Sequence, residues 1–208
     1  MGEEPERDFP LFPLGIVALP GELVPLHIFE ERYKTMINVC LREEREFGIL
    51  WLSDEGLHDV GCACTIERLI ELMDDGRMNL VARGTRPIRI VERQAELPYP
   101  AGVVEFLPDR VETVDEALAR QAHNAFADLV RRATDRDPED EELKSLSAYE
   151  MAARVEFGLE AKQGLLGMRS ENARLGLVAR LFRAALKRLD FVDRAQARAR
   201  SNGKVRFA

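Results

Sequence analysis

The chain has 208 residues, of which 46% are hydrophobic and 32% are charged, and its formal net charge is -7. This balance excludes a collagen-like or wholly disordered chain, and no stretch approaches the roughly 20 apolar residues that span a bilayer. The acidic balance argues against a dedicated nucleic-acid binder, because such proteins neutralise phosphates. Three cysteines are too few for a disulfide scaffold, and the acidic N-terminus lacks the apolar core of a signal peptide. We therefore expect a cytoplasmic protein that is not bound to a membrane.

Short apolar segments separated by turn residues fill the first half of the chain and predict β-strands. Prolines lie within the segments 9–14 and 23–29 and directly after the segment 16–19, which places these segments at edges or corners of a sheet. The segment 47–52 is a strong strand candidate, and 99–107 supplies one more strand. Many short strands with close turns suggest a small β-barrel.

A hairpin is predicted around Asp75-Gly76, because Asp-Gly is a strong signal for a tight turn between strands. A two-residue loop and a four-residue loop both place Met73 opposite Met78. We expect an exposed methionine pair at the hairpin tip, since methionine adapts to varied partners on binding surfaces. The alternative is that the pair caps the core or covers the helical half.

Helical periodicity is confined to residues 30–44 in the first half and dominates the second half. Thr113–Glu116 and Ser147–Glu150 match the capping-box pattern, so each should open a helix. The longest helix should begin near Ser170 or Asn172. Its apolar residues alternate at spacings of three and four, which is typical of a packing seam: Leu175, Val178, Phe182, Ala185 and Leu189. Phe182 lies in the middle of this seam and should be buried.

Few residues carry a chemical signature. Cys62 and Cys64 lie near His58, but ligands on one strand do not easily surround a tetrahedral ion, so we interpret the cysteines as small core residues and predict no metal site. His27 is interpreted as a hydrogen-bonded structural histidine. Trp51 ends a strand and forms either part of the core or the wall of a groove. The acidic pairs and serines lack a catalytic context, so no catalytic residue is predicted.

Several motifs occur in a characteristic order. They are Leu11-Phe-Pro-Leu14, Leu19-Pro-Gly21, Pro25-Leu-His-Ile-Phe-Glu-Glu-Arg-Tyr33, Val60-Gly61, Ile66, Asp75-Gly76-Arg77, Val81-Ala-Arg-Gly84, Arg89-Ile90, Lys162-Gln163, Leu165-Leu166 and Arg174-Leu175. Together they resemble the N-terminal substrate-binding domain of the Lon protease family over residues 9–190. The chain departs from the pattern at Pro87, where many members carry arginine, and at Cys62 and Cys64, where small polar or apolar residues are usual.

The resemblance implies a PUA-like β-barrel followed by a helical bundle, in a domain that recognises substrate and performs no chemistry. We therefore predict an α+β chain. A PUA-like small β-barrel with one inserted helix should occupy residues 9–110, a helical bundle residues 111–190, and a basic, mobile tail residues 191–208. The chain contains no nucleotide-binding loop and has no room for an AAA+ module or a Ser–Lys protease domain.

The predicted function is that of a stand-alone Lon-type recognition module that is not an enzyme and uses no cofactor. It would bind unfolded or apolar segments of client proteins, or dock to a protease or chaperone. Met73, Met78 and Trp51 are the candidate partner-binding residues. Two alternatives are an RNA-binding PUA-like protein, which the basic C-terminal part favours, and a hydrolase without a recognisable motif.

Overall fold

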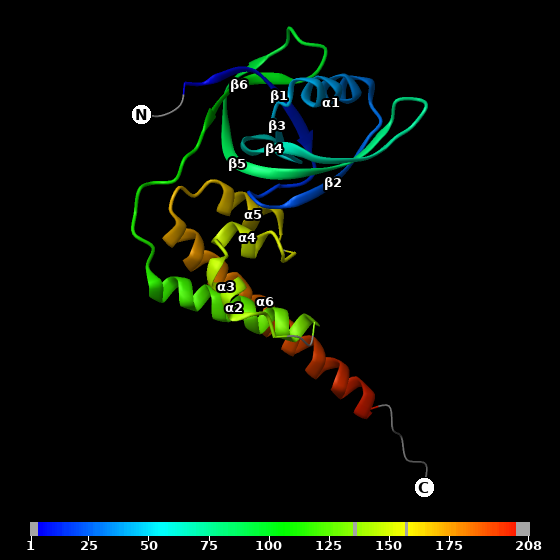
Figure 1. Cartoon of the computed structure of the whole chain (residues 1–208). Helices are drawn as coiled ribbons and strands as arrows, with labels where there is room; N and C mark the ends of the chain where they lie inside the picture. Colours follow the sequence, from blue (N-terminus) through cyan, green and yellow to red (C-terminus); the bar gives the residue numbers. More distant parts are fainter. Residues whose placement is uncertain (1–3, 135–136, 157, 203–208) are drawn as a thin grey trace. The chain divides into compact units, whose positions relative to one another are not determined.

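The computed structural model describes residues 4–134, 137–156 and 158–202, which form two compact units (Figure 1). The sheet unit contains the described residues of Met1–Glu112 and Tyr149–Glu171, and the helical unit those of Thr113–Ala148 and Asn172–Ala208. The strands are β1 (Glu6–Leu14), β2 (Leu23–Ile28), β3 (Phe47–Ser53), β4 (Gly56–Leu72), β5 (Met78–Gln94) and β6 (Ala101–Phe106). The helices are α1 (Glu31–Glu43), α2 (Glu116–Thr134), α3 (Asp140–Ser145), α4 (Ala148–Ala152), α5 (Leu159–Leu166) and α6 (Glu171–Asn202).

The six strands form one mixed sheet in the order β2-β5-β4-β3-β1-β6. The long strand β5 also pairs with β6, so β5, β4, β3, β1 and β6 follow one another in a closed ring of pairings. The β1–β3 pair is parallel and the others are antiparallel. The mixed sheet with its inserted helix α1 and the later helices confirms the α+β prediction.

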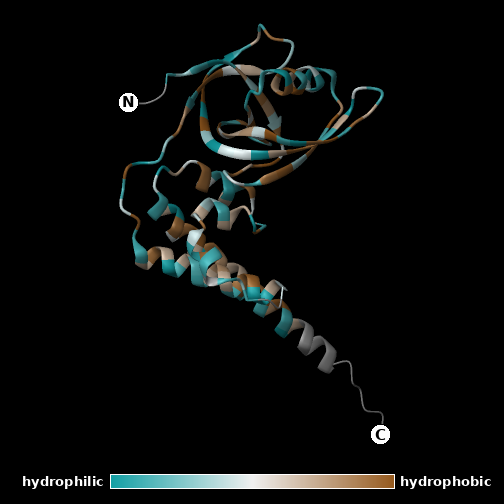
Figure 2. Cartoon of the chain, viewed as in Figure 1, coloured by the Kyte–Doolittle hydropathy of each residue, from teal (hydrophilic) through white to brown (hydrophobic). Residues whose placement is uncertain are grey.

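Apolar side chains that alternate along the strands fill the inside of this ring, and Figure 2 shows hydrophobic and hydrophilic residues interleaved along the sheet. This is the period-two pattern expected of strands with one buried face. The core cluster consists of Phe9, Leu11, Leu50, Ala63, Ile88, Ile90 and Val104. Because members of five strands meet there, the ring is held by burial of apolar surface.

Helix α1 packs on the other face of the sheet through four buried residues: Tyr33, Met36, Ile37 and Cys40. The ring of Tyr33 lies 4.3 Å from that of Phe12 in β1. Leu41, which follows Cys40 on the helix, is 36% exposed. This helix brings Tyr33 to the ends of β1 and β2, where the groove described below is formed.

The segment Tyr149–Glu171 belongs to the sheet unit, whereas the predicted helical bundle over 111–190 included it. Polar as well as apolar contacts hold this segment on the sheet unit. Lys162 on α5 forms a largely buried ion pair with Glu22, with 2.6 Å between Nζ and Oε1. Gln163 donates to the carbonyl of Val60 in β4 at 2.9 Å. These bonds fasten α5 to the strands of the same unit.

The helical unit is built mainly from α2, α3 and α6. Helix α2 begins at Glu116, and Asp115 rather than Thr113 caps it, because Asp115 Oδ1 accepts from the N–H groups of Ala117 and Leu118. Phe182 is completely buried, which confirms its prediction, and its ring lies 5.4 Å from that of Phe126.

Helix α6 continues to Asn202, so the first part of the tail expected over 191–208 is helical. Residues 203–208 lie outside the described part of the chain. Among the described helices, none has both the length and the apolar content needed to cross a membrane.

Candidate functional site

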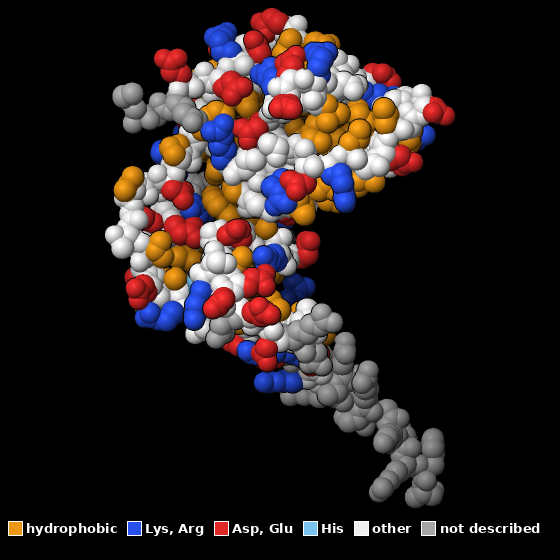
Figure 3. Space-filling view, viewed as in Figure 1, with side chains coloured by type: hydrophobic (Ala, Val, Ile, Leu, Met, Phe, Trp, Pro, Cys, Tyr) orange, Lys and Arg blue, Asp and Glu red, His pale blue; other side chains and the backbone are white. Residues whose placement is uncertain are grey.

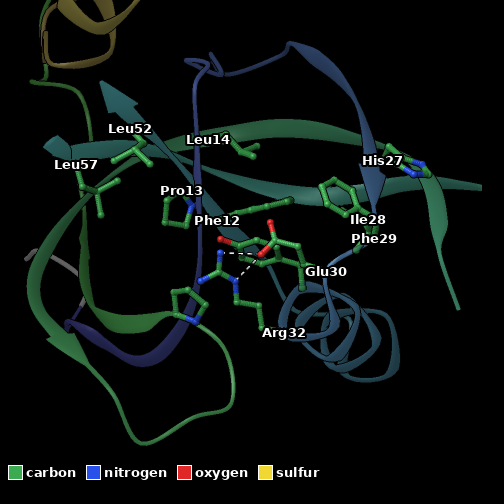
Figure 4. Close-up of a pocket in the computed structure, with 12 residues that line it drawn as sticks. Phe12, Pro13, Leu14, His27, Ile28, Phe29, Glu30, Arg32, Leu52 and Leu57 are labelled. Carbon is green, nitrogen blue, oxygen red and sulfur yellow. Dashed lines mark hydrogen bonds and ion pairs between the residues drawn. The ribbon is translucent and has the colours of Figure 1, made fainter. Parts of the chain in front are cut away.

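An apolar surface groove of about 510 Å³ lies in the sheet unit between the ends of β1 and β2 and the start of α1. Phe12 and Tyr33 form its buried base, while Phe29 and Leu52 remain 60% and 50% exposed. Figure 4 shows Leu52 and Leu57 on one side and Phe29 on the other. Figure 3 shows apolar side chains gathered on this unit with charged side chains around them.

Local geometry explains why large apolar groups stay exposed here. Ile28, the last residue of β2, is 1% exposed, and the alternation of a strand turns the next residue, Phe29, to the opposite side. Helix α1 starts at Glu31, so Phe29 lies in the short link between strand and helix. Leu52 lies two residues after the fully buried Leu50, and the pairing of β3 with β4 shifts register between them, so the exposed Leu52 does not share the buried face of Leu50.

The charged groups of the groove are paired with each other. Arg32 and Glu30 form an ion pair with 2.8 Å between Nη2 and Oε2, drawn in Figure 4, and the Arg32 guanidinium lies 4.5 Å above the Tyr33 ring. Burial raises the pKa of the Tyr33 hydroxyl above its ordinary value, so this group stays neutral at physiological pH. The groove therefore has an uncharged apolar base and a compensated polar margin.

A hydrogen-bonded chain across three strands holds one side of the groove. Asn79 Nδ2 donates to Glu71 Oε2 at 2.9 Å, so the amide oxygen of Asn79 is left to accept from His27 Nδ1 at 2.7 Å. His27 Nδ1 must therefore carry a proton. The His27 ring stacks on Phe29 with 5.8 Å between ring centres. His27 is hydrogen-bonded, as predicted, and it positions an exposed aromatic group.

The predicted Met73–Met78 pair is wrong. Met78 is 1% exposed and pairs in register with Leu72, whereas the N–H of the half-buried Met73 donates to the carbonyl of Arg77. Gly76 has a positive φ of 78° and donates to the carbonyl of Met73, which makes a three-residue loop with a glycine bulge. This odd loop length shifts the register by one residue, so Met78 belongs to the core.

Trp51 is half-buried at the end of β3 and stacks on His58 with 4.3 Å between ring centres. It is not one of the residues that line the groove, and neither are Met73 and Met78. The sequence prediction missed Phe29 and Leu52. For Phe29 the available signal was the alternation itself, which places a large apolar residue on the solvent side just after the buried Ile28, whereas the register shift before Leu52 gave no such signal.

The residues weighed as metal ligands make contacts of their own. Cys62 and Cys64 are fully buried, and their thiols donate to the carbonyls of Ala63 and Cys62. The His58 ring nitrogen instead lies 3.2 Å from Ser53 Oγ. Within the described residues there is no cluster of three His, Cys, Asp or Glu side chains suited to a metal ion.

The buried thiols yield a prediction. Burial raises the pKa of Cys40 from 9.0 to about 11 and also raises that of Cys62, and the thiolate is the reactive form. We expect iodoacetamide at pH 8 to leave all three cysteines of the native protein unmodified for hours, and to modify all three in guanidinium chloride. Mass spectrometry counts the adducts. Rapid modification of the native protein would show that these sites open to solvent.

The arginines of β5 face carboxylates on neighbouring elements. The ion pairs are Arg83–Glu67, Arg86–Glu46, Arg89–Glu105 and Arg93–Asp59, with N–O distances of 2.9, 3.1, 3.1 and 3.5 Å. An RNA-binding sheet needs positive charge available to phosphates. This strand offers compensated charge instead.

Comparison with known proteins gives a consistent result. Residues 8–183 match the family described as the ATP-dependent protease La (LON) substrate-binding domain. The chain is 27% identical to Lon protease 2 of Myxococcus xanthus, over 93% of this chain and 26% of that protein. It is 28% identical to the Lon protease of Anaeromyxobacter dehalogenans strain 2CP-C, over 89% of this chain and 24% of that protein. The chain thus spans about a quarter of the length of these relatives.

Solved structures show the same fold. A crystal structure of a Lon N-terminal domain protein from Xanthomonas campestris matches with a TM-score of 0.62 and 25% identity, over 80% of this chain and 94% of that one. The N-terminal domain of a Mycobacterium avium complex Lon protease matches with a TM-score of 0.65 and 19% identity, over 84% and 97%. The comparisons give no support to RNA binding. The chain belongs to the Lon substrate-binding domain family.

Proposed function

We propose that this chain is a non-enzymatic recognition module that binds unfolded or apolar segments of client proteins in the groove at the ends of β1 and β2. The observation that carries the proposal is the pair of exposed side chains, Phe29 and Leu52, above a buried aromatic base. Such a client would be delivered to a protease or chaperone. The family membership supports a role in substrate recognition.

The groove favours binding of exposed apolar side chains. Unfolded chains expose apolar side chains that folded proteins hide, and burying them against Phe29 and Leu52 removes apolar surface on both partners from water. The paired charges of Arg32 and Glu30 need no counter-charge from the client. The groove is thus suited to apolar segments of varied sequence.

Two finer features belong to the same proposal. We infer that the closed ring of strand pairings is a small barrel of PUA-like type, because β5 closes it by pairing with both β4 and β6. Trp51 and Met73, both half-buried, are candidate contacts outside the groove. Met78, the third candidate, would act only by supporting the hairpin from the core.

The test compares groove and non-groove variants. We expect Phe29→Ser with Leu52→Ser to weaken binding of a fluorescently labelled, reduced and carboxymethylated α-lactalbumin about tenfold or more, because two partly exposed apolar side chains are removed. Fluorescence anisotropy measures the affinity. The matched control is Val91→Ser, since Val91 is 59% exposed on β5 and lies outside the groove.

The control variant should bind like the wild type, and all variants should keep the wild-type melting temperature. Native α-lactalbumin should not bind, and the client should remain intact on a gel after incubation, with or without ATP. Equal affinity of the groove variant and the wild type would overturn the assignment of the groove. Cleavage of the client would overturn the non-enzymatic role.

A further inference from the structure

We propose that the client segment is held as an added β-strand on the free edge of β2. This inference rests on the proposed function and names the conformation that the site selects: extended, with its backbone amides available. The proposal follows from the hydrogen-bond register of β2, from the end of β1, and from the two hollows at the ends of β2.

The register of β2 shows which backbone groups are free. The N–H of Gly84 donates to the carbonyl of Glu22 at 2.9 Å, and Leu23 pairs with Arg83. Leu23 is therefore in a non-hydrogen-bonded pair, and alternation turns the backbone groups of Leu23, Pro25 and His27 away from β5. Within the described part of the chain, β5 is the only strand paired with β2.

The end of β1 offers a second unpaired edge beside the same groove. The N–H of Leu11 donates to the carbonyl of Pro100, and the pairing of β1 with β6 extends no further than Pro10. Pro13 and Leu14 pair only with β3 among the described strands, and both line the groove together with His27. An added strand would thus lie beside unpaired backbone groups of both β2 and the end of β1.

Hollows at both ends of β2 can receive side chains of an added strand. The apolar groove lies at the His27 end, and a second hollow of about 380 Å³ lies at the Leu23 end, where its lining includes Glu150 and Arg154. Alternate side chains of an extended segment point the same way, at about 6.6 Å intervals. One short segment could therefore reach from a polar hollow to an apolar one.

Pro25 identifies the occupant as a client rather than a second copy of this chain. Proline has no N–H, so two β2 strands paired edge to edge would each lack a donor near the centre. A client segment can donate its own N–H to the Pro25 carbonyl. The edge is thereby protected against self-association and remains able to accept an extended peptide of another protein.

Backbone N-methylation tests the proposal directly, because it removes one donor while keeping the side chain. The probe is the fluorescein-labelled peptide Lys-Thr-Val-Thr-Phe-Thr-Val-Thr-Lys, with single N-methyl groups placed in turn along its length. We expect affinity to fall about fivefold to tenfold at alternate residues and to change little at the intervening ones, since only every second amide faces β2. Hydrogen exchange measured by NMR should show new protection of the Leu23 and His27 amides.

The outcomes separate the two proposals. Binding of both the peptide and carboxymethylated α-lactalbumin without a period-two effect of N-methylation would overturn strand addition and leave groove recognition intact. Binding of neither would overturn both. Unchanged exchange of the Leu23 and His27 amides in the saturated complex would likewise exclude β2 as the pairing edge.

Discussion

Replacing Phe182 with alanine is expected to lower the free energy of unfolding of the helical unit by about 3–5 kcal/mol, because it leaves a cavity in a packed interior. Phe182 is completely buried, and its ring contacts that of Phe126 on α2. Denaturant titration followed by circular dichroism measures the loss. The helical unit depends on a few such contacts, so we expect this to be among the most damaging truncations in the chain.

Helix α6 supplies the matched control. Phe191 lies nine residues further along the same helix and is 73% exposed. Phe191→Ala removes the same atoms from the surface, and its effect should stay within about 0.5 kcal/mol. A loss of less than about 1 kcal/mol for Phe182→Ala, or equal losses for the two variants, would contradict the seam described for α6.

Replacing Lys162 with methionine is expected to cost about 3 kcal/mol or more, because the Glu22 carboxylate would stay buried without its cation. The two side chains are only 9% and 15% exposed and lie 2.6 Å apart. Glu22 also accepts the backbone N–H of Leu19. Adding Glu22→Gln should recover part of the loss, because the amide oxygen still accepts from Leu19 and no buried charge remains.

The exposed pair of Arg83 and Glu67, whose side chains are 41% and 43% exposed, is the control. Solvent screens this pair, so Arg83→Met should cost no more than about 1 kcal/mol. Thermal melts of the three variants against the wild type give the comparison. Similar losses for Lys162→Met and Arg83→Met would show that burial does not strengthen the Lys162–Glu22 interaction.

Local patterns predicted the elements well where one physical rule decided the outcome. The apolar period located α1, α2 and α6, and strand alternation located β3 and the β4–β5 hairpin. The methionine register failed because the Asp-Gly signal does not distinguish a two-residue loop from a three-residue loop with a bulge. The observed register differs from the predicted one by one residue, and this difference places Met78 in the core rather than at the surface.

Local sequence patterns could not predict the groove, because the residues that line it are far apart in the sequence. Phe12 and Leu52 come from β1 and β3, and Phe29 comes from the link after β2, so the three meet only once these strands occupy one sheet. The same limitation applies to Lys162 and Glu22, which are far apart in the chain. The family resemblance contained several of these residues but did not show that they surround a common surface.

The division of the chain between the units has a consequence for biosynthesis. The sheet unit is interrupted by Thr113–Ala148 and resumes at Tyr149–Glu171. At ~5–20 residues per second, a ribosome adds the intervening and completing residues about 3–12 s after Glu112. During that interval Glu22 lacks Lys162, and the surface that α5 will cover is open to water or to chaperones. A nascent chain ending at Glu112 should therefore be sensitive to protease, and resistance should appear only after Glu171 has left the ribosomal tunnel.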